Sequence, residues 1–405
     1  MTSIFSRHGV PVFASFFLWS FGTGGMRLAR PLFAASFGVP LVLVTLIISS
    51  NTVSQLIAAP VTGHLIDRWG RRPLLIAALA LRGATCFAIF FAGSYLEFLI
   101  YEFIGGVGVS MWVTSSTVLV ADMSVAANRG RVVAARNIAS RIGFVTGPFV
   151  AAAIAGLADL RWVFIFNGIT KVLILAIVFW LVGETRPEAA AGASRPRATL
   201  DRTAFAMFLS RQFLAIAVVA WAVAMMTQGL FQSLFPLYLQ TEKGFSTGEV
   251  GHLIAIAGVA TLLVSMPNGY VVDAFGRKLT LIPGLVVLGL SAPLLVWIGA
   301  GDLLTAVAVM VLYGIGEGVC FGASQAYAMD LAPEQRRGAF LGVWSLVSHA
   351  GAAFGPVATG LLAQTSGYPL TFGAAAGLMV LSAALMWALG PDTRARRGAP
   401  ATAAA

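Results

Sequence analysis

Between two long apolar runs the chain reads Gly63-His64-Leu65-Ile66-Asp67-Arg68-Trp69-Gly70-Arg71-Arg72-Pro73. A related turn follows about half a chain later and reads Gly269-Tyr270-Val271-Val272-Asp273-Ala274-Phe275-Gly276-Arg277-Lys278. Both copies concentrate charge in a stretch whose flanks are strongly apolar. Two copies of one turn at equivalent places indicate an internally duplicated protein.

The composition is that of an integral membrane protein. Of the 405 residues, 58% are hydrophobic and only 10% are charged, whereas a soluble protein carries about 25% charged residues. The apolar runs reach the roughly 20 residues that an α-helix needs to cross the hydrocarbon core, and barrel strands would instead alternate in segments of about 10. The predicted fold is an all-α integral membrane protein with twelve transmembrane helices, over residues 11–35, 41–66, 73–94, 96–122, 131–157, 161–183, 212–240, 247–272, 279–299, 302–330, 338–365 and 369–390.

The second half repeats the first at a nearly constant offset. At 208 residues, Asp122 aligns with Asp330, Arg129-Gly130 with Arg337-Gly338, and Gly147-Pro148 with Gly355-Pro356. We therefore predict three parts: an N-terminal six-helix bundle over residues 1–183, a polar cytoplasmic linker over 184–211, and a C-terminal six-helix bundle with a short cytoplasmic tail over 212–405. Because both halves start on the same side, they are parallel repeats related by an axis along the membrane normal.

The cationic residues orient the chain. Of the 26 lysines and arginines, all but seven lie at the N-terminus, at the alternate loops after spans 2, 4, 6, 8 and 10, or in the C-terminal tail. The positive-inside rule places both termini and the repeated turn in the cytoplasm. Abundant alanine and arginine, with few lysines, indicate a GC-rich bacterial source. The predicted location is a bacterial cytoplasmic (inner) membrane.

These residues resemble the major facilitator superfamily of secondary transporters. Gly63-x-Leu65-x-Asp67-Arg68-x-Gly70-Arg71-Arg72 fits the family's loop motif between spans 2 and 3, and Gly143-x-x-x-Gly147-Pro148 is similar to the core of the fifth-span motif of its antiporters. The resemblance implies a cavity lined mainly by spans 1, 4, 7 and 10, with alternating access by rocking of the two halves. One position departs from the family: Glu102 stands four residues before Gly106-Val107-Gly108, where an arginine is usual.

Glu102 is the first candidate site, because an ionisable residue inside a span is costly and marks function by default. At a rise of about 1.5 Å per residue, Arg27 lies roughly 24 Å above the start of span 1 and Glu102 roughly 9 Å below the outer end of span 4. We hypothesise an Arg27–Glu102 ion pair that is opened by a proton or by substrate. Alternatively, both side chains reach the outer headgroups or water.

The other charges within spans are ranked by depth and by register. Glu317 lies near the middle of span 10, where a short carboxylate cannot reach the interface, so it is a candidate proton site. Arg141 and His349 occupy the same register in the two halves and are candidates to gate the cavity or to balance Glu317. For His349, a packing role is the competing interpretation. Arg82 and Lys171 are expected to serve structural pairing or to snorkel.

Uncharged polar residues complete the predicted cavity. On span 7, Gln228 and Gln232 recur with aromatic and Met residues at helical spacing, and Asn51 and Gln55 do so on span 2. An aromatic and Met-rich surface suits amphipathic substrates of varied shape. The competing interpretation of the apolar members is helix packing or a lipid-facing surface.

Several classes of protein are excluded. Cys86 and Cys320 both lie in apolar spans, so the sequence indicates neither a disulfide framework nor a metal site. It contains no Ser-His-Asp arrangement, P-loop or zinc-spaced ligand set, and no basic tract with interleaved aromatics. We predict that the protein is not an enzyme, has no cofactor beyond the proton gradient that drives it, and binds no nucleic acid.

Three functions remain open. The first is proton-coupled export of small amphipathic or drug-like molecules, with Glu102 and Glu317 carrying protons or a cationic substrate. The second is proton-coupled transport of an organic anion or metabolite bound by Arg27 and Arg141. The third is a non-transporting scaffold or sensor, against which the charges in the membrane argue. The partners are a small-molecule substrate, protons and lipid, and the chain is expected to function as a monomer.

The repeated turn is also predicted to be a conformational latch, because the resemblance assigns Asp67, Arg71 and Asp122 to a charge cluster that holds the cytoplasmic side shut. The latch residues are Gly63, Asp67, Arg68, Gly70, Arg71, Arg72 and Asp122 in the first copy, and Asp273, Gly276, Arg277 and Asp330 in the second. For the arginines, positive-inside anchoring alone is the alternative.

The second copy carries Ala274 where the first has Arg68, so the two latches should differ in importance. We expect Asp67→Asn to impair transport more than Asp273→Asn at equal surface expression. Equal transport rates for the two variants would contradict this asymmetry.

Overall fold

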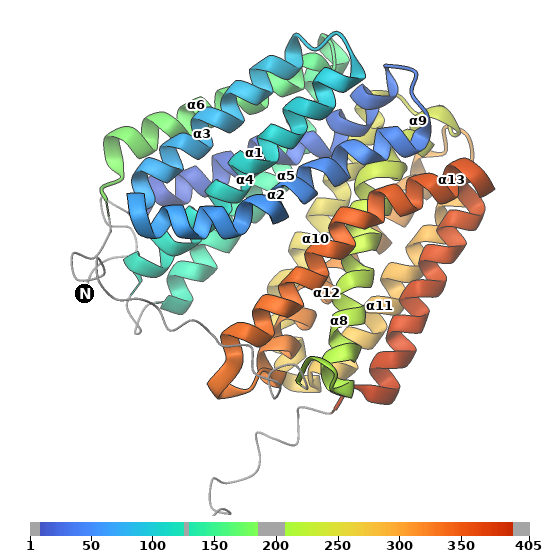
Figure 1. Cartoon of the computed structure of the whole chain (residues 1–405). Coiled ribbons are helices and arrows are strands. Elements are labelled where there is room, and N and C mark those ends of the chain that lie inside the picture. Colours follow the sequence, from blue (N-terminus) through green and yellow to red (C-terminus); the bar gives the residue numbers. More distant parts are fainter. Residues whose placement is uncertain (1–8, 125–128, 185–206, 392–405) are drawn as a thin grey trace, which may run out of the picture. The chain divides into compact units, whose positions relative to one another are not determined.

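The structure is a computed structural model, described here for residues 9–124, 129–184 and 207–391. Its regular elements in these residues are all helices, joined by short turns (Figure 1). The first half contains α1 (Gly9–Ala35), α2 (Leu41–Trp69), α3 (Arg71–Phe90), α4 (Tyr95–Met123), α5 (Arg129–Leu157) and α6 (Arg161–Leu181). The second contains α8 (Arg211–Ala224), the π-helix η2 (Met225–Leu234), α9 (Phe235–Thr241), α10 (Thr247–Phe275), α11 (Arg277–Leu294), η3 (Leu295–Trp297), α12 (Leu303–Leu331), η4 (Glu334–Arg336) and α13 (Arg337–Leu389).

These helices confirm the predicted fold class. Ten of the described helical segments are long and apolar enough to cross a membrane, with α8, η2 and α9 forming one of them. α1 is less apolar because glycine, serine and threonine interrupt its apolar residues. α13 covers two predicted spans and is broken at Gly367, whose φ of 81° and ψ of 165° are not helical. Pro369 follows two residues later, in the first turn of the next helix, where its missing N–H is not needed.

The described residues divide into two compact units, which we consider separately. The first contains residues 9–124, 129–184 and 232–255, and the second contains residues 207–231 and 256–391. The division into bundles over 1–183 and 212–405 stays a prediction. In the first unit, a core of buried apolar side chains joins α1 to α4, and within it Trp19 and Trp112 stack with ring centroids 4.6 Å apart.

Each copy of the charged turn has a glycine at its sharpest point. Gly70 ends α2 and precedes α3 with φ of 93°, and Gly276 does the same between α10 and α11 with φ of 92°. Only glycine adopts this region without steric cost. The turn can therefore reverse the chain between two spans in a single residue.

The glycines of the antiporter-like motif bring two helices into backbone contact. On α5, a Cβ at Gly143 would overlap the carbonyl oxygen of Phe17 on α1, and one at Gly147 would overlap that of Phe21. In the second unit, Gly351 on α13 lies in the same way against the carbonyl oxygen of Trp221 on α8. Small residues allow this close approach, which drives helix association in membranes.

This packing predicts the effect of a larger residue at Gly147. Gly147→Leu should destabilise the protein by about 1–3 kcal/mol or more, because the obstacle is backbone that cannot move aside. Gly156→Leu, on the same helix with open space around it, is the matched control. Cys86 and Cys320 are both buried, so thermal unfolding in detergent can be followed by their reaction with a thiol-specific fluorophore. Equal unfolding temperatures for the two variants would contradict the close-contact model.

Candidate functional site

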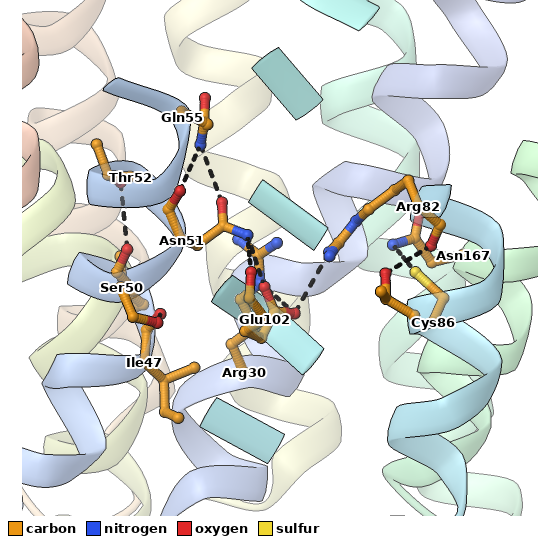
Figure 2. Close-up of polar contacts among 12 residues, drawn as sticks. Arg30, Ile47, Ser50, Asn51, Thr52, Gln55, Arg82, Cys86, Glu102 and Asn167 are labelled. Carbon is orange, nitrogen blue, oxygen red and sulfur yellow. Dashed lines mark hydrogen bonds and ion pairs between the residues drawn. The ribbon is translucent and has the colours of Figure 1, made fainter. Parts of the chain in front are cut away.

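The first unit is built around the carboxylate of Glu102 on α4, which has no exposed area. Its Oε1 accepts from Arg30 Nε of α1 at 3.1 Å and from Arg82 Nη2 of α3 at 3.3 Å. Its Oε2 accepts from Asn51 Nδ2 of α2 at 2.8 Å. Figure 2 shows all three donors converging on this one side chain. A single carboxylate thus connects four helices.

Polar and small residues next to Glu102 hold this arrangement. Asn51 Nδ2 also donates to the backbone oxygen of Glu102 at 2.9 Å, and Asn51 Oδ1 accepts from Gln55 Nε2 at 2.9 Å (Figure 2). A Cβ at Gly106 would overlap the backbone oxygen of Asn51, and one at Gly105 would overlap Arg82. The glycines after Glu102 therefore make room for the ion cluster. Asn51 and Gln55 thus contact the cluster, and their predicted place in a substrate cavity stays a prediction.

The hypothesis of an Arg27–Glu102 ion pair is wrong. Arg27 lies over the ring of Phe144 on α5, with its Cζ 5.2 Å from the ring centroid. Arg30, one helical turn further on, reaches Glu102 instead. Helical rise fixes the depth of a residue but not the direction of its side chain, and depth alone could not separate two arginines three residues apart.

The sequence predicts that Arg82 either pairs with another charge or snorkels to the interface, and in the structure it pairs with Glu102. Its side chain is only 2% exposed, so it does not reach the interface. Two guanidinium groups now share one buried carboxylate, and the hydrogen bonds among them replace the water that each charge has lost. A direct signal for Arg30 and Arg82 was present in the sequence, since each is a cation inside a predicted span.

The second unit holds Glu317 in a different setting. Glu317, on α12, is half-buried, and its Oε2 accepts from Thr261 Oγ1 of α10 at 3.0 Å. No cation pairs with it among the described residues. One turn earlier, Tyr313 stacks on Phe231 with ring centroids 3.6 Å apart. The carboxylate thus has a neutral hydroxyl partner and an aromatic pair on the same helix.

The two glutamines of span 7 lie on a π-helix, which the sequence did not predict. Gln228 and Gln232 belong to η2, Met225–Leu234, where the hydrogen bonds run from i to i+5. The predicted face of residues at α-helical spacing is therefore interrupted. Thr359 Oγ1 of α13 donates to the backbone oxygen of Gly229 at 2.7 Å, which ties the π-helix to its neighbour. π-Helical turns are frequent at functional sites.

Arg141 and His349 lie in separate units. Arg141 is half-buried on α5. His349 is exposed on α13, and its Nδ1 lies 2.7 Å from the backbone oxygen of Ser345. A bond within its own helix fits the packing interpretation of His349, and its predicted gating role remains untested.

The charged turns make matching ion pairs inside their own units. Arg71 Nε donates to Asp122 Oδ2 at 2.8 Å, and Arg277 Nε donates to Asp330 Oδ2 at the same distance. The residues aligned by the duplication therefore make the same contact. Asp67 and Arg68 are exposed, whereas the side chain of Asp273 lies outside the described residues.

The first turn has a further partner that the sequence did not indicate. Glu184, after α6, accepts through Oε1 from the backbone N–H of Arg71 and through Oε2 from that of Arg72, both at 3.0 Å. A carboxylate at a helix N-terminus accepts hydrogen bonds from free N–H groups and is attracted to the positive end of the helix dipole. Arg72 Nη2 in turn donates to the backbone oxygen of Phe179 at 2.6 Å. These contacts fix the start of α3 to the end of α6.

Ion-paired charges inside apolar spans are typical of membrane proteins that move ions or substrates. The family model of the Major Facilitator Superfamily matches residues 12–248 and 219–405, and the chain belongs to this family. It is therefore a multi-pass secondary transporter and not an enzyme.

Relatives and solved structures agree with the family. The chain is 24% identical to the Cis,cis-muconate transport protein of Acinetobacter baylyi over 323 residues, 76% of each protein. It is 23% identical to Multidrug resistance protein 2 of Bacillus subtilis over 351 residues, 84% of this chain and 85% of that relative. The crystal structure of a D-xylose-proton symporter matches with a TM-score of 0.77 at 19% identity, over 95% of this chain and 98% of the other. At this identity the structural likeness establishes the fold alone.

The ion cluster predicts the effect of removing its carboxylate. Glu102→Gln should destabilise the protein by about 3–5 kcal/mol, because two buried guanidinium groups lose their only shared anion. Glu97→Gln, at the exposed start of the same helix, is the matched control and should change little. Unfolding temperatures in detergent measure both, and an unchanged value for Glu102→Gln would mean that the cluster does not stabilise the fold.

Proposed function

We propose that this transporter exports small amphipathic or drug-like molecules in exchange for protons, by alternating access. The observation that carries the proposal is Glu317, a half-buried carboxylate within a membrane span that accepts one hydrogen bond, from the neutral hydroxyl of Thr261. Carboxylates at such depth belong to proton relays and to sites for cationic substrates.

The chemistry around Glu317 supports an amphipathic substrate. Either a proton or an organic cation can neutralise the Glu317 carboxylate. Because the carboxylate carries a single negative charge, it binds one of the two at a time. The neighbouring stack of Tyr313 on Phe231 adds aromatic surface on the same helix. Aromatic rings attract cations and bury apolar area. The 23% identity to Multidrug resistance protein 2 of Bacillus subtilis is in keeping with this substrate class.

A second candidate is transport of an organic anion, and the ion cluster of the first unit favours it. There, two guanidinium groups face one carboxylate, and Arg30 is the more accessible of the two, with 14% of its side chain exposed. An anionic substrate could take the place of Glu102 at Arg30. This version replaces the predicted anion ligands Arg27 and Arg141 with Arg30. The Cis,cis-muconate transport protein of Acinetobacter baylyi is a relative at 24% identity.

The charged turns are proposed to serve the cycle as latches. Each turn fixes its own helices through the pairs Arg71–Asp122 and Arg277–Asp330, which presents a rigid end to the rest of the protein. We keep the cytoplasmic position of the turns and of both termini, the bacterial inner membrane and the monomeric state as parts of this proposal. The proton gradient is its driving force.

Flux into proteoliposomes under an imposed pH gradient tests the proposal. Ethidium serves as the amphipathic cation and cis,cis-muconate as the organic anion. We expect the wild type to move ethidium against its gradient and Glu317→Gln to abolish this movement, because an amide cannot bind and release the proton. Glu334→Gln, an exposed carboxylate of the same half, is the control. Muconate flux alone would favour the second candidate, and full ethidium accumulation by Glu317→Gln would contradict the role of Glu317.

A further inference from the structure

Lys171 is a buried cation that neither candidate mechanism uses. It lies in the middle of α6, its side chain has no exposed area, and its Nζ points to α1. The nearest acceptors are Trp19 O at 3.3 Å, Thr23 Oγ1 at 3.4 Å and Thr170 Oγ1 at 3.4 Å. The ring of Trp19 lies 4.4 Å away. All of these partners are neutral, and no carboxylate contacts Lys171 among the described residues.

The space around Lys171 is closed. A Cβ at Gly22 of α1 would overlap Thr170 and would lie 2.6 Å from Asn167 Oδ1 and 3.2 Å from Lys171 Nζ. A Cβ at Gly83 of α3 would come 3.6 Å from the Cβ of Lys171. The glycines of the two facing helices thus provide just enough room for the lysine. A proton fits such a site, whereas a molecular ligand does not.

The charges near Lys171 are mostly positive. A protonated Lys171 would add a further cation to a region where Arg30 and Arg82 already share one carboxylate, and an uncompensated ion is costly in a dry interior. The neutral amine avoids this cost, while the Trp19 ring and the carbonyl oxygen favour the ammonium. The charged and titratable groups on the helices packed against α6 are Arg27 and Arg30 of α1, Arg71, Arg72, Arg82 and Cys86 of α3, and Arg129, Arg131, Arg136 and Arg141 of α5. Glu102 of α4 reaches this region through Arg82.

Within the described part of the chain, two polar atoms beside this site have no hydrogen-bond partner. Arg82 Nη1 is a buried donor without an acceptor, and Asn167 Oδ1 is a buried acceptor without a donor. Figure 2 shows Arg82, Cys86 and Asn167 side by side, with Asn167 Nδ2 donating to Cys86 Sγ at 3.2 Å. Unpaired buried groups are costly, so an arrangement that pairs these two atoms would be favoured over this one. Arg82 connects this region directly to Glu102.

We propose that Lys171 is a proton-binding site coupled through Arg82 to Glu102. The inference rests on the proposed proton coupling and adds a second proton site in the other half of the chain. A proton from water forms an N–H bond with the Nζ lone pair when Arg82 is fully compensated by Glu102. The same bond breaks and the proton returns to water when an anion or a movement of Arg82 changes that compensation. No other bond is made or broken.

Selective labelling tests the proton site without a substrate, because the chain has only three lysines, Lys171, Lys243 and Lys278. The NMR signals of ¹³Cε-lysine in detergent are assigned with Lys243→Arg and Lys278→Arg, which leave Lys171 intact. As the pH changes from mildly acidic to mildly alkaline, we expect the Lys171 signal to move further than the other two. A Lys171 signal that stays constant over this range overturns the proposal.

Two variants of α4 test whether the protonation of Lys171 depends on Glu102. Glu102→Gln removes the carboxylate that compensates Arg82 and should change the pH dependence of the Lys171 signal. Glu97→Gln, on the exposed end of the same helix, should leave it unchanged. An identical titration in Glu102→Gln and Glu97→Gln would mean that Lys171 is not coupled to Glu102.

Transport measurements on Lys171 variants test the role of Lys171 in proton coupling separately from the proposed export of amphipathic molecules. In proteoliposomes, Lys171→Met and Lys171→Arg should both lose pH-driven accumulation of ethidium while retaining ethidium movement down its own gradient, because neither side chain exchanges a proton. Unchanged accumulation in both variants overturns the role of Lys171 in coupling. Failure of the wild type to move ethidium counts against the proposed function, and the NMR titration then still decides whether Lys171 binds a proton.

Discussion

The ion cluster of Glu102 is the interaction on which the first unit depends. A carboxylate without solvent contact has to receive its hydrogen bonds from the protein, and those donors come from α1, α2 and α3. None of the three helices can shift along α4 without breaking a charged contact, which is expensive in a dry interior. The cluster therefore fixes the register of four helices, a task that apolar packing in a membrane performs poorly because lipid is equally apolar.

The two halves repeat their packing but not their chemistry. Close glycine contacts join α1 to α5 and α8 to α13, and equivalent Arg–Asp pairs close the two charged turns. The charges deeper in the spans differ. The first unit has a cation-rich cluster around Glu102, and the second has Glu317 with a hydroxyl partner. Duplication has preserved the scaffold, while each half carries its own ionisable groups.

Much of the fold could be predicted from the sequence, because spans are set by runs of apolar residues and turns by glycine and charge. The division of α13 at Gly367 falls between two predicted spans. The partners of Glu102 could not be predicted, since Arg27 and Arg30 lie at nearly the same depth and differ in direction. The π-helix at Met225–Leu234 could not be predicted either, because the amino-acid composition does not distinguish a π-helix from an α-helix. The sequence assigns Glu184 to the polar linker, whereas in the structure its carboxylate caps the N-terminus of α3.

The π-helix has a geometrical consequence for span 7. The chain passes from the second compact unit to the first between Phe231 and Gln232, within η2. A π-helix holds more residues per turn than an α-helix, so the residues beyond η2 point in other directions than an uninterrupted α-helix would give them. The direction in which the side chains of α9 point is therefore set by the π-helix that precedes it. The change of helix type thus lies where span 7 passes from one compact unit to the other.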